Sequence, residues 1–315
     1  MGTSQQDIFG AAARALPATP GSYGQRPAGY RLPESLRLGP VRLQVADLER
    51  SLAYYQRTLG LRLLEQAGAQ ATLGPVGAAV PLVELHERRG ARPALTRGQT
   101  GLFHFAILLP DRASLGRFVR HLGQIGARAG AGDHLVSEAF YLQDPDNLGI
   151  EVYADRPRSG WRRVGRELMM ATDPVDVPGV VAEAGEEPWR GMPRDTRMGH
   201  VHLHVGNIEA ASAFYSEGLG FDRTVWDYPG ALFMSAGGYH HHLAVNTWGG
   251  SGAAPPTDAD AQLLEWTIDL ATAGDTDAAS ASLRQAGFTT EAAGPAAFVA
   301  RDPWGTRLRL RTGTS

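Results

Sequence analysis

One sequence pattern occurs twice in this chain, and the duplication limits the fold more than any single motif does. The stretch "VADLERSLAYYQRTLGLRLLE" begins at Val45, and "VGNIEAASAFYSEGLGFDRTV" begins 160 residues later, at Val205. Both read as a strand end, a turn with Asp or Asn, an amphipathic helix and a Leu-Gly stop. Two later pairs, "LGQIGA" with "LRQAGF" and "DPDNLGIEVY" with "DPWGTRLRLR", have nearly the same offset. The chain is therefore an internal duplication.

Each half divides again into two similar units, each with a strand, a helix and about three further strands. The units cover roughly residues 39–90, 100–155, 198–250 and 262–313. One such unit buries little surface by itself, so we expect the units to pair and to curve their sheets into open barrels. The predicted class is α+β, with four βαβββ units paired into two open, curved-sheet barrels.

These units suggest the domain boundaries. We expect an N-terminal half over residues 37–155 and a C-terminal half over residues 198–315. Residues 1–36 are rich in Gly, Pro, Ala and Gln and are predicted to form a mobile tail. Residues 156–197 form a polar connector with one short helix expected near Pro178–Glu183, the proline lying in its first turn.

Composition excludes several classes of function. Thirty basic and 33 acidic residues give a net charge of −3, which does not indicate a nucleic-acid partner. No run approaches the ~18 apolar residues of a membrane span, and the N-terminus lacks the pattern of a secretory signal. A cytoplasmic location without a membrane partner is therefore expected. The chain has no cysteine, so any metal must take nitrogen and oxygen ligands.

Histidines point to units two and three as the units that carry chemistry. When the unit starts are aligned, His104 in "GLFHFAIL" and His200 in "MGHVHLHV" both open the first strand, where unit four has Glu265. At the last strand, unit two has Glu151 where unit four has Arg309. A lone histidine in a strand is more often a packing residue than a ligand. Two at equivalent positions, with a glutamate closing one unit, indicate a shared site.

Two neutral imidazoles and one carboxylate are the donors of a 2-His-1-carboxylate facial triad, which leaves open positions on Fe(II). His104, His200 and Glu151 supply this set. All three must lie about 2 Å from one ion. We therefore predict that unit two pairs with unit three and unit one with unit four. Pairing one-with-two and three-with-four would split the triad.

The remaining histidines have more than one interpretation. Residues 240–242, in "GGYHHHLAV", are three adjacent histidines. Side chains alternate along a strand, so the three cannot close on one ion. His202 and His204 share a strand face with His200. We expect both to line a substrate pocket, and an equally weighted alternative is that they fill the barrel.

One segment, "GDHLVSEAFYLQDPDNLGIEVYAD" at residues 132–155, has a specific motif. Its parts are Gly132, His134, Phe140, Tyr141, Asp144, Pro145 and Glu151. With the four βαβββ units, this motif resembles the vicinal oxygen chelate (glyoxalase-like) superfamily, and within it the type I extradiol (catechol 2,3-) dioxygenases. Asn147 stands where the family has Gly or Pro, and Asn tolerates the left-handed turn.

The resemblance implies an activity and a set of roles. Such enzymes are Fe(II)-dependent oxidoreductases that cleave a catechol-type aromatic diol beside its hydroxyl groups and insert both atoms of O2. The resemblance makes His241 the acid/base beside the substrate, and it makes His134 and Tyr141 the hydrogen-bond partners of the substrate oxygens. Mn(II) shares the ligand preferences of Fe(II). We also expect a homo-oligomer, because open barrel edges commonly pair.

Two other classes of function remain as alternatives. A glyoxalase-like metal-dependent lyase or isomerase would need a carboxylate at the end of unit three, where the chain has His241 and His242. A non-enzymatic small-molecule binding protein of the same fold would need no metal ligands, and the complete triad argues against it.

Overall fold

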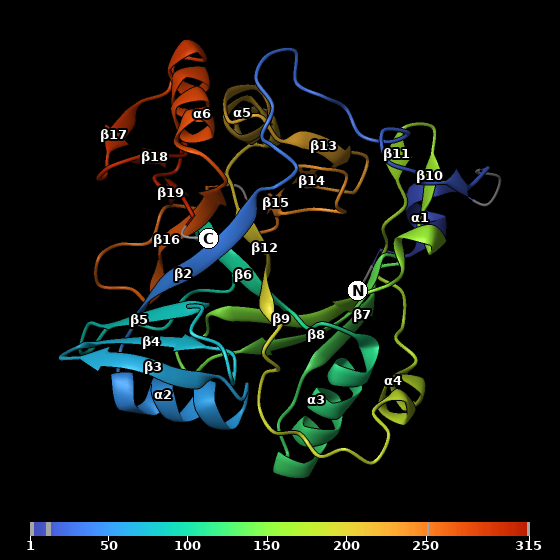
Figure 1. The fold of residues 1–315 in the computed structure, drawn as a ribbon, viewed down its shortest axis with the longest axis vertical. Coiled ribbons are helices and arrows are strands. Elements are labelled where there is room, and N and C mark those ends of the chain that lie inside the picture. The colour runs from blue at the N-terminus through green and yellow to red at the C-terminus, as the bar shows by residue number, and fades with distance from the viewer. Residues whose placement is uncertain (1–2, 11–13, 251, 314–315) are drawn as a thin grey trace.

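The computed structural model describes residues 3–10, 14–250 and 252–313, and most of its strands lie in two curved eight-stranded sheets (Figure 1). The first sheet has the order β13-β14-β15-β12-β6-β9-β8-β7. Its strands are β6 (Gly101–Leu108), β7 (Gly130–Asp133), β8 (Ser137–Gln143), β9 (Gly149–Asp155), β12 (Arg197–His204), β13 (Asp222–Val225), β14 (Ala231–Ser235) and β15 (Leu243–Asn246). The second sheet has the order β17-β18-β19-β16-β2-β5-β4-β3. Its strands are β2 (Arg37–Val45), β3 (Arg62–Ala67), β4 (Gln70–Gly74), β5 (Val83–Glu87), β16 (Gln262–Leu270), β17 (Thr290–Ala292), β18 (Ala297–Arg301) and β19 (Arg307–Thr312).

Strands from opposite halves of the chain meet at the centre of each sheet. In the first sheet, β6 runs antiparallel to β12, with His104 opposite His202. In the second sheet, β2 runs antiparallel to β16. The predicted pairing of unit two with unit three and of unit one with unit four is confirmed. The α+β class with four βαβββ units is confirmed as well.

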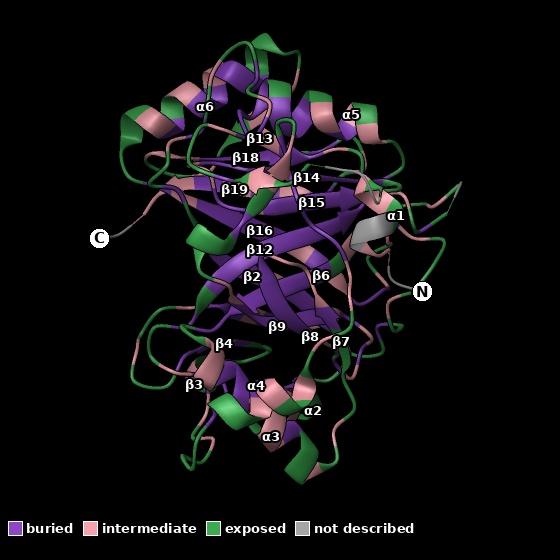
Figure 2. Ribbon diagram, turned by 90° about the vertical axis from the view of Figure 1, so that its right-hand side faces the viewer, coloured by how far each residue is buried: buried purple, intermediate pink, exposed green. Residues whose placement is uncertain are grey.

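The helix of each unit begins after a side chain that caps it. The helices are α2 (Leu48–Arg57), α3 (Arg112–Ile125), α5 (Ile208–Ser212) and α6 (Ala273–Gln285), and α5 continues as a π-helix over Ala213–Gly218. The caps are Asp47, Asp111, Asn207 and Thr272, each of which accepts a hydrogen bond from the backbone N–H three residues further on. Figures 1 and 2 show α2 and α3 at one end of the molecule and α5 and α6 at the other, with buried strands between them.

The connector between the halves is folded onto them. It contains a 3-10 turn (Arg158–Gly160), β10 (Arg162–Val164), β11 (Glu167–Leu168) and α4 (Val177–Glu183). The helix expected near Pro178–Glu183 is confirmed, with the proline in its first turn. Glu167 accepts the backbone N–H groups of Trp226 and Asp227, which ties β11 to the C-terminal half.

The N-terminal segment also lies against the fold. It contains α1 (Gln5–Phe9) and β1 (Leu16–Pro17), and β1 pairs with β10 of the connector. Tyr23, Leu32 and Leu36 are buried, and the N–H of Leu32 donates to the carbonyl of Gly220. These contacts belong to described residues of the segment expected as a mobile tail over residues 1–36, and residues 1–2 and 11–13 lie outside the described residues.

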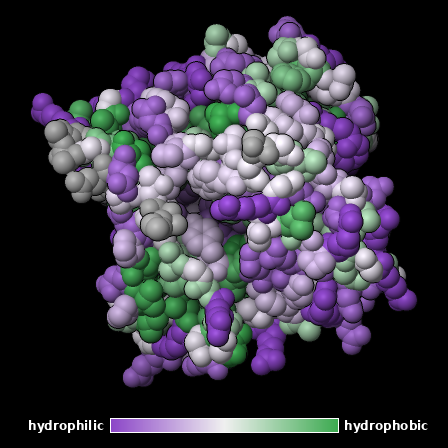
Figure 3. Space-filling model, turned by 180° about the vertical axis from the view of Figure 1, so that it is seen from behind, coloured by the Kyte–Doolittle hydropathy of each residue, from purple (hydrophilic) through white to green (hydrophobic). Residues whose placement is uncertain are grey.

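The surface is mixed in character. The face in Figure 3 has hydrophilic residues over much of its area and hydrophobic residues in smaller groups. Among the described residues, the large hydrophobic side chains that are exposed are Val76, Val80, Leu95, Phe103 and Trp248. Within the described ranges, no helix has the length and apolar character needed to cross a membrane.

Candidate metal centre

Three side chains from three neighbouring strands surround Ala106 at the middle of the first sheet. Ala106 of β6 lies opposite His200 of β12 on one side and opposite Glu151 of β9 on the other. His104 lies two residues before Ala106 on the same strand, so it projects from the same face. Because Ala106 has only a methyl group, the space above it stays open to the three larger side chains. The strand register therefore brings the predicted ligands together.

The donor atoms of these three side chains lie at the spacing of ligands that share one ion. Oε2 of Glu151 is 3.0 Å from Nε2 of His104 and 3.1 Å from Nε2 of His200, and the two imidazole nitrogens are 3.4 Å apart. Two metal bonds of ~2.1 Å at a right angle would place their donor atoms about 3.0 Å apart. Oε1 of Glu151 is buried without a hydrogen-bond partner among the described residues. A buried carboxylate with a free oxygen is suited to a cation.

Protonation also suits metal binding. Burial lowers the pKa of His200 to about 4, and the adjacent Glu151 carboxylate opposes this shift only in part. Burial alone would raise the pKa of Glu151, but the attraction and hydrogen bonds of His200 and His104 outweigh burial and hold it well below its ordinary value. Near neutral pH, His200 is thus a neutral imidazole and Glu151 a carboxylate, the forms that bind a metal ion.

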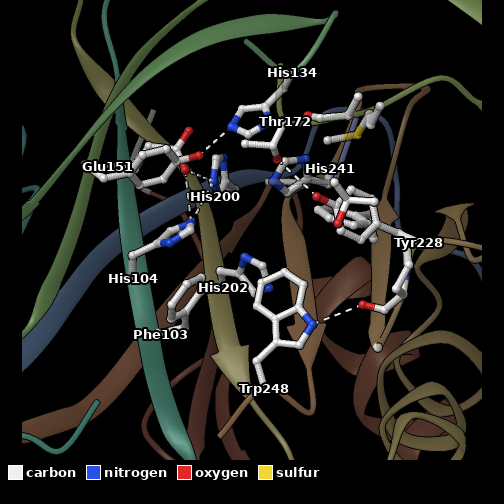
Figure 4. Close-up of a pocket in the computed structure, with 17 residues that line it drawn as sticks. Phe103, His104, His134, Glu151, Thr172, His200, His202, Tyr228, His241 and Trp248 are labelled. Carbon is white, nitrogen blue, oxygen red and sulfur yellow. Dashed lines mark hydrogen bonds and ion pairs between the residues drawn. The ribbon is translucent and has the colours of Figure 1, made fainter. Parts of the chain in front are cut away.

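A cavity of about 670 Å³ opens onto these three side chains. Its described lining consists of Thr3, Phe103, His104, His134, Tyr141, Glu151, Met170, Ala171, Thr172, His200, His202, Tyr228, Pro229, Gly230, Phe233, His241 and Trp248. Figure 4 shows His104, Glu151 and His200 turned toward one another, with Trp248 across the cavity from them. A cavity of roughly 150 Å³ accommodates benzene, so this one has room for an aromatic ring with a substituent.

Tyr141 and His134 lie beside the three converging side chains and are hydrogen-bonded to each other. Tyr141 on β8 lies opposite Glu151 in the sheet register. The carbonyl of Ala171 accepts from Nδ1 of His134 (2.6 Å), so Nε2 of His134 is left to accept from the hydroxyl of Tyr141. Burial and the charge of Glu151 raise the pKa of Tyr141 well above its ordinary value. The phenol therefore stays protonated, and its oxygen can accept from a ligand in the cavity.

The three adjacent histidines have three different surroundings. They precede β15, which begins at Leu243, so strand alternation does not apply to them. His241 lines the cavity, 4.0 Å from His200 between ring centroids. His240 is fully buried behind His241, and Nδ1 of His242 faces the hydroxyl of Ser235 instead. The three do not converge on one ion, as the sequence predicted.

The two predicted pocket histidines differ from each other. His202 lines the cavity, and the side-chain amide of Asn246 donates to its Nε2 (2.9 Å). His204 is outside the described lining, because its ring packs against Phe103 and its Nδ1 is bonded to Oδ1 of Asn246 (2.6 Å). At the register shift after His202 the unpaired residue is Phe103 of β6, which lines the cavity and packs against the rings of both His202 and His204.

Several lining residues come from segments that sequence reasoning did not assign to the site. Met170, Ala171 and Thr172 belong to the connector, and Tyr228 to the loop after β13. The hydroxyl groups of Thr172 and Tyr228 are 3.0 Å apart, which links the two segments at the cavity wall. These loops have no hydrophobic periodicity, so the sequence pattern does not predict that they reach the cavity.

The second sheet has an ion-pair cluster where the first sheet has His104, Glu151 and His200. Glu265, which corresponds to His104 and His200, is buried, and its Oε1 accepts from Nε of Arg309 (2.7 Å). Arg307 and Arg42 also lie within 3.5 Å of this carboxylate. Burial would raise the pKa of Glu265, but the arginines outweigh burial and lower it. Guanidinium groups balance the carboxylate here, so the described residues of this sheet offer no set of free donors.

Known proteins share both the sequence pattern and the fold. The chain is 45% identical over 263 residues to a catechol-2,3-dioxygenase of Bacillus subtilis (strain 168), which covers 82% of this chain and 91% of that protein. A solved structure of a candidate dioxygenase from the same strain covers 91% of this chain and 87% of its own, with a TM-score of 0.62 at 12% identity. Glyoxalase I from Zea mays covers 88% of this chain and 92% of its own, with a TM-score of 0.53 at 18% identity.

The family assignment follows from two matched stretches. The model of the Glyoxalase/Bleomycin resistance protein/Dioxygenase superfamily matches residues 37–152 and 197–310. These stretches contain the four βαβββ units and the three converging side chains His104, Glu151 and His200. The chain belongs to the Glyoxalase/Bleomycin resistance protein/Dioxygenase superfamily.

Proposed function

We propose that this chain is an Fe(II)-dependent extradiol dioxygenase that cleaves a catechol-type aromatic diol. One ring carbon–carbon bond beside the diol breaks and both atoms of O2 enter the product, so the reaction needs no other oxidant or reductant. The convergence of His104, Glu151 and His200 in one cavity carries the proposal. The name of the 45% identical Bacillus relative supports it.

The ligand set suits a singly deprotonated diol. When bound, the ion supplies Lewis acidity, which lowers the pKa of a phenol, and open coordination positions. Glu151 contributes one negative charge against the two positive charges of Fe(II). A diol that has lost one proton then completes the charge balance in this buried site.

Three further side chains act on the protons and the charge of the substrate. We assign Tyr141, oriented by His134, to accept the hydrogen bond of the substrate hydroxyl that keeps its proton. We assign His241, whose ring borders the same cavity, to take a proton from the diol and to return it to the developing product. Aromatic and apolar walls, among them Phe233 and Met170, exclude water around them.

Oxygen uptake on adding catechol to anaerobically Fe(II)-loaded protein tests the proposal. We expect uptake in proportion to a yellow ring-fission product, and loss of both in His200→Ala and Glu151→Ala. Arg309→Lys in the second sheet is the control and should keep the activity. Tight metal binding without uptake across a set of catechols would favour a lyase or isomerase. Protein that binds no metal would contradict the ligand assignment itself.

A further inference from the structure

Three side chains form a line from the edge of the molecule to the cavity. Asp155, the last residue of β9, lies with Oδ1 3.0 Å from Nε2 of His240. Nδ1 of His240 lies 2.7 Å from Nδ1 of His241. The side chain of Asp155 is 26% exposed, His240 is fully buried, and His241 borders the cavity (Figure 4). The line therefore joins the cavity to the surface by hydrogen bonds.

We propose that Asp155 and His240 are positioning residues that hold His241 with its proton on Nδ1 and its Nε2 lone pair toward the cavity. The inference rests on the proposed function only for the role of His241. The tautomer of the His241 ring does not depend on the activity and can be measured separately.

The direction of the hydrogen bonds follows from the acceptor at the outer end. An ionised carboxylate only accepts, so Nε2 of His240 must donate to Asp155. A neutral imidazole has one donor and one acceptor, which makes Nδ1 of His240 the acceptor. Nδ1 of His241 must then be the donor in the 2.7 Å contact. This leaves Nε2 of His241 without a proton, and no described residue of the protein hydrogen-bonds it.

Neighbouring groups hold this line in place. The hydroxyl of Tyr239 also donates to Oδ1 of Asp155 (3.0 Å), and the hydroxyl of Tyr153 lies 2.7 Å from that of Tyr239. Both groups orient protons toward the carboxylate and reinforce its role as acceptor. A Cβ at position 199 would overlap the hydroxyl of Tyr153, so Gly199 is needed for this approach.

The backbone of His240 is fixed as well. Its carbonyl accepts from the hydroxyl of Thr224 (2.7 Å), and its ring packs 5.6 Å from that of Trp161 between centroids. Both ring nitrogens of His240 are thus hydrogen-bonded within the protein, which fixes the orientation of its ring.

The tautomer decides what His241 can do in the cavity. With its proton on Nδ1, the ring presents a lone pair that can accept a proton from a diol hydroxyl. With its proton on Nε2, the same ring could only donate at that position. Loss of the Asp155 carboxylate removes the preference for the Nδ1–H tautomer of His241, because His240 could then either donate or accept at its Nδ1. The ring of His241 would also be held less firmly.

The experiment compares wild-type protein with Asp155→Ala. Two-bond ¹H–¹⁵N correlation spectra of the full chain, labelled with ¹⁵N-histidine and loaded with diamagnetic Zn(II), report which nitrogen of His241 carries the proton. We expect the Nδ1–H form in the wild type and a mixture of forms in Asp155→Ala. With Fe(II) and catechol, we expect kcat of the variant to fall about tenfold while KM changes less than about twofold.

Asp269→Ala is the matched control. Its carboxylate lies one residue before the end of β16 in the second sheet, is 24% exposed and is paired with Arg311, so this variant removes a negative charge of comparable exposure. A wild-type His241 protonated on Nε2 would overturn the inference, as would an Asp155→Ala protein with unchanged tautomer and unchanged kcat. Wild-type protein with the expected tautomer but no oxygen uptake would support the inference while contradicting the proposed function.

Discussion

The hydroxyl of Tyr55 donates a hydrogen bond to the carboxylate of Asp144 over 3.1 Å, although 89 residues separate them. Tyr215 and Asp302 repeat this contact in the C-terminal half, over 3.0 Å. Each contact joins the helix of one unit to the turn before the last strand of the next unit. The sheets therefore connect opposite halves of the chain, while the tyrosines connect units within one half.

Removing one of these hydroxyl groups should destabilise the fold measurably. In Tyr55→Phe, the buried Asp144 loses a partner, and we expect the free energy of unfolding to fall by roughly 1–3 kcal/mol. Urea unfolding followed by circular dichroism measures the change. The control is Tyr54→Phe, because no described residue hydrogen-bonds the hydroxyl of Tyr54. Equal losses in both variants would contradict the role given to this contact.

Asp144 should also make stability depend on pH. Burial raises its pKa to about 6, although the backbone N–H groups of Leu148 and Asp146 oppose the shift. The unfolded chain has an ordinary value near 3.9, so the folded state holds the proton more tightly. The stability contributed by this proton is complete below about pH 4 and is lost as the pH rises through about 6.

The variant Asp144→Asn should remove this contribution, because an amide does not ionise in that range. We expect its free energy of unfolding to change less between pH 4 and pH 6.5 than that of the wild type. Urea titrations at several pH values give the free energy of unfolding as a function of pH. Parallel curves for the wild type and Asp144→Asn would show that Asp144 does not titrate as described.

Ala106 should control metal binding through its size. In Ala106→Val, two added methyl groups enter the space between His104, Glu151 and His200, and we expect metal content to fall at least about tenfold. Ala106→Gly keeps the space open and should bind metal as the wild type does. Metal analysis after dialysis gives the comparison, and circular dichroism verifies the fold. Full metal content in Ala106→Val would place the ion elsewhere.

The cavity should discriminate against anionic substituents. No Lys or Arg occurs among the described lining residues, and Glu151 already contributes negative charge. An additional carboxylate on the diol would be buried without a partner. We expect kcat/KM for 4-methylcatechol to exceed that for 3,4-dihydroxybenzoate at least about tenfold.

A variant of the cavity wall checks the charge argument. Thr172→Lys adds a cation at the cavity wall and should reduce the preference for 4-methylcatechol over 3,4-dihydroxybenzoate. Thr172→Val should leave this preference unchanged. A wild type that prefers the carboxylated diol would contradict the argument.

The sequence predicted the convergence of His104, Glu151 and His200 and the pairing of the units because both follow from periodic features. His104 and His200 stand out when the units are aligned, and the need to join them with Glu151 determines which units pair. Asn147 has the predicted left-handed conformation, with φ of 64°. Such inferences succeed where repeats, strand alternation and coordination chemistry act together.

Other parts of the site were not predictable in this way. Met170 and Thr172 reach the cavity through an irregular connector whose path depends on tertiary contacts. His204 has the same strand periodicity as His202, yet only His202 lines the cavity, and the ring of Phe103 packs against both. The contact between His240 and His241 requires a bend before β15, where a strand pattern predicts opposite faces.

The ion-pair cluster around Glu265 means that the buried carboxylates of the two sheets are balanced differently. Arg309 and its neighbouring arginines are part of the chain, so the negative charge of Glu265 is balanced as soon as the chain folds. In the first sheet, under the proposed function, Glu151 takes its counter-charge from a bound cation instead. A chelator should therefore weaken one sheet and spare the other. Under the proposed function, the metal content would then affect the stability of the protein as well as its activity.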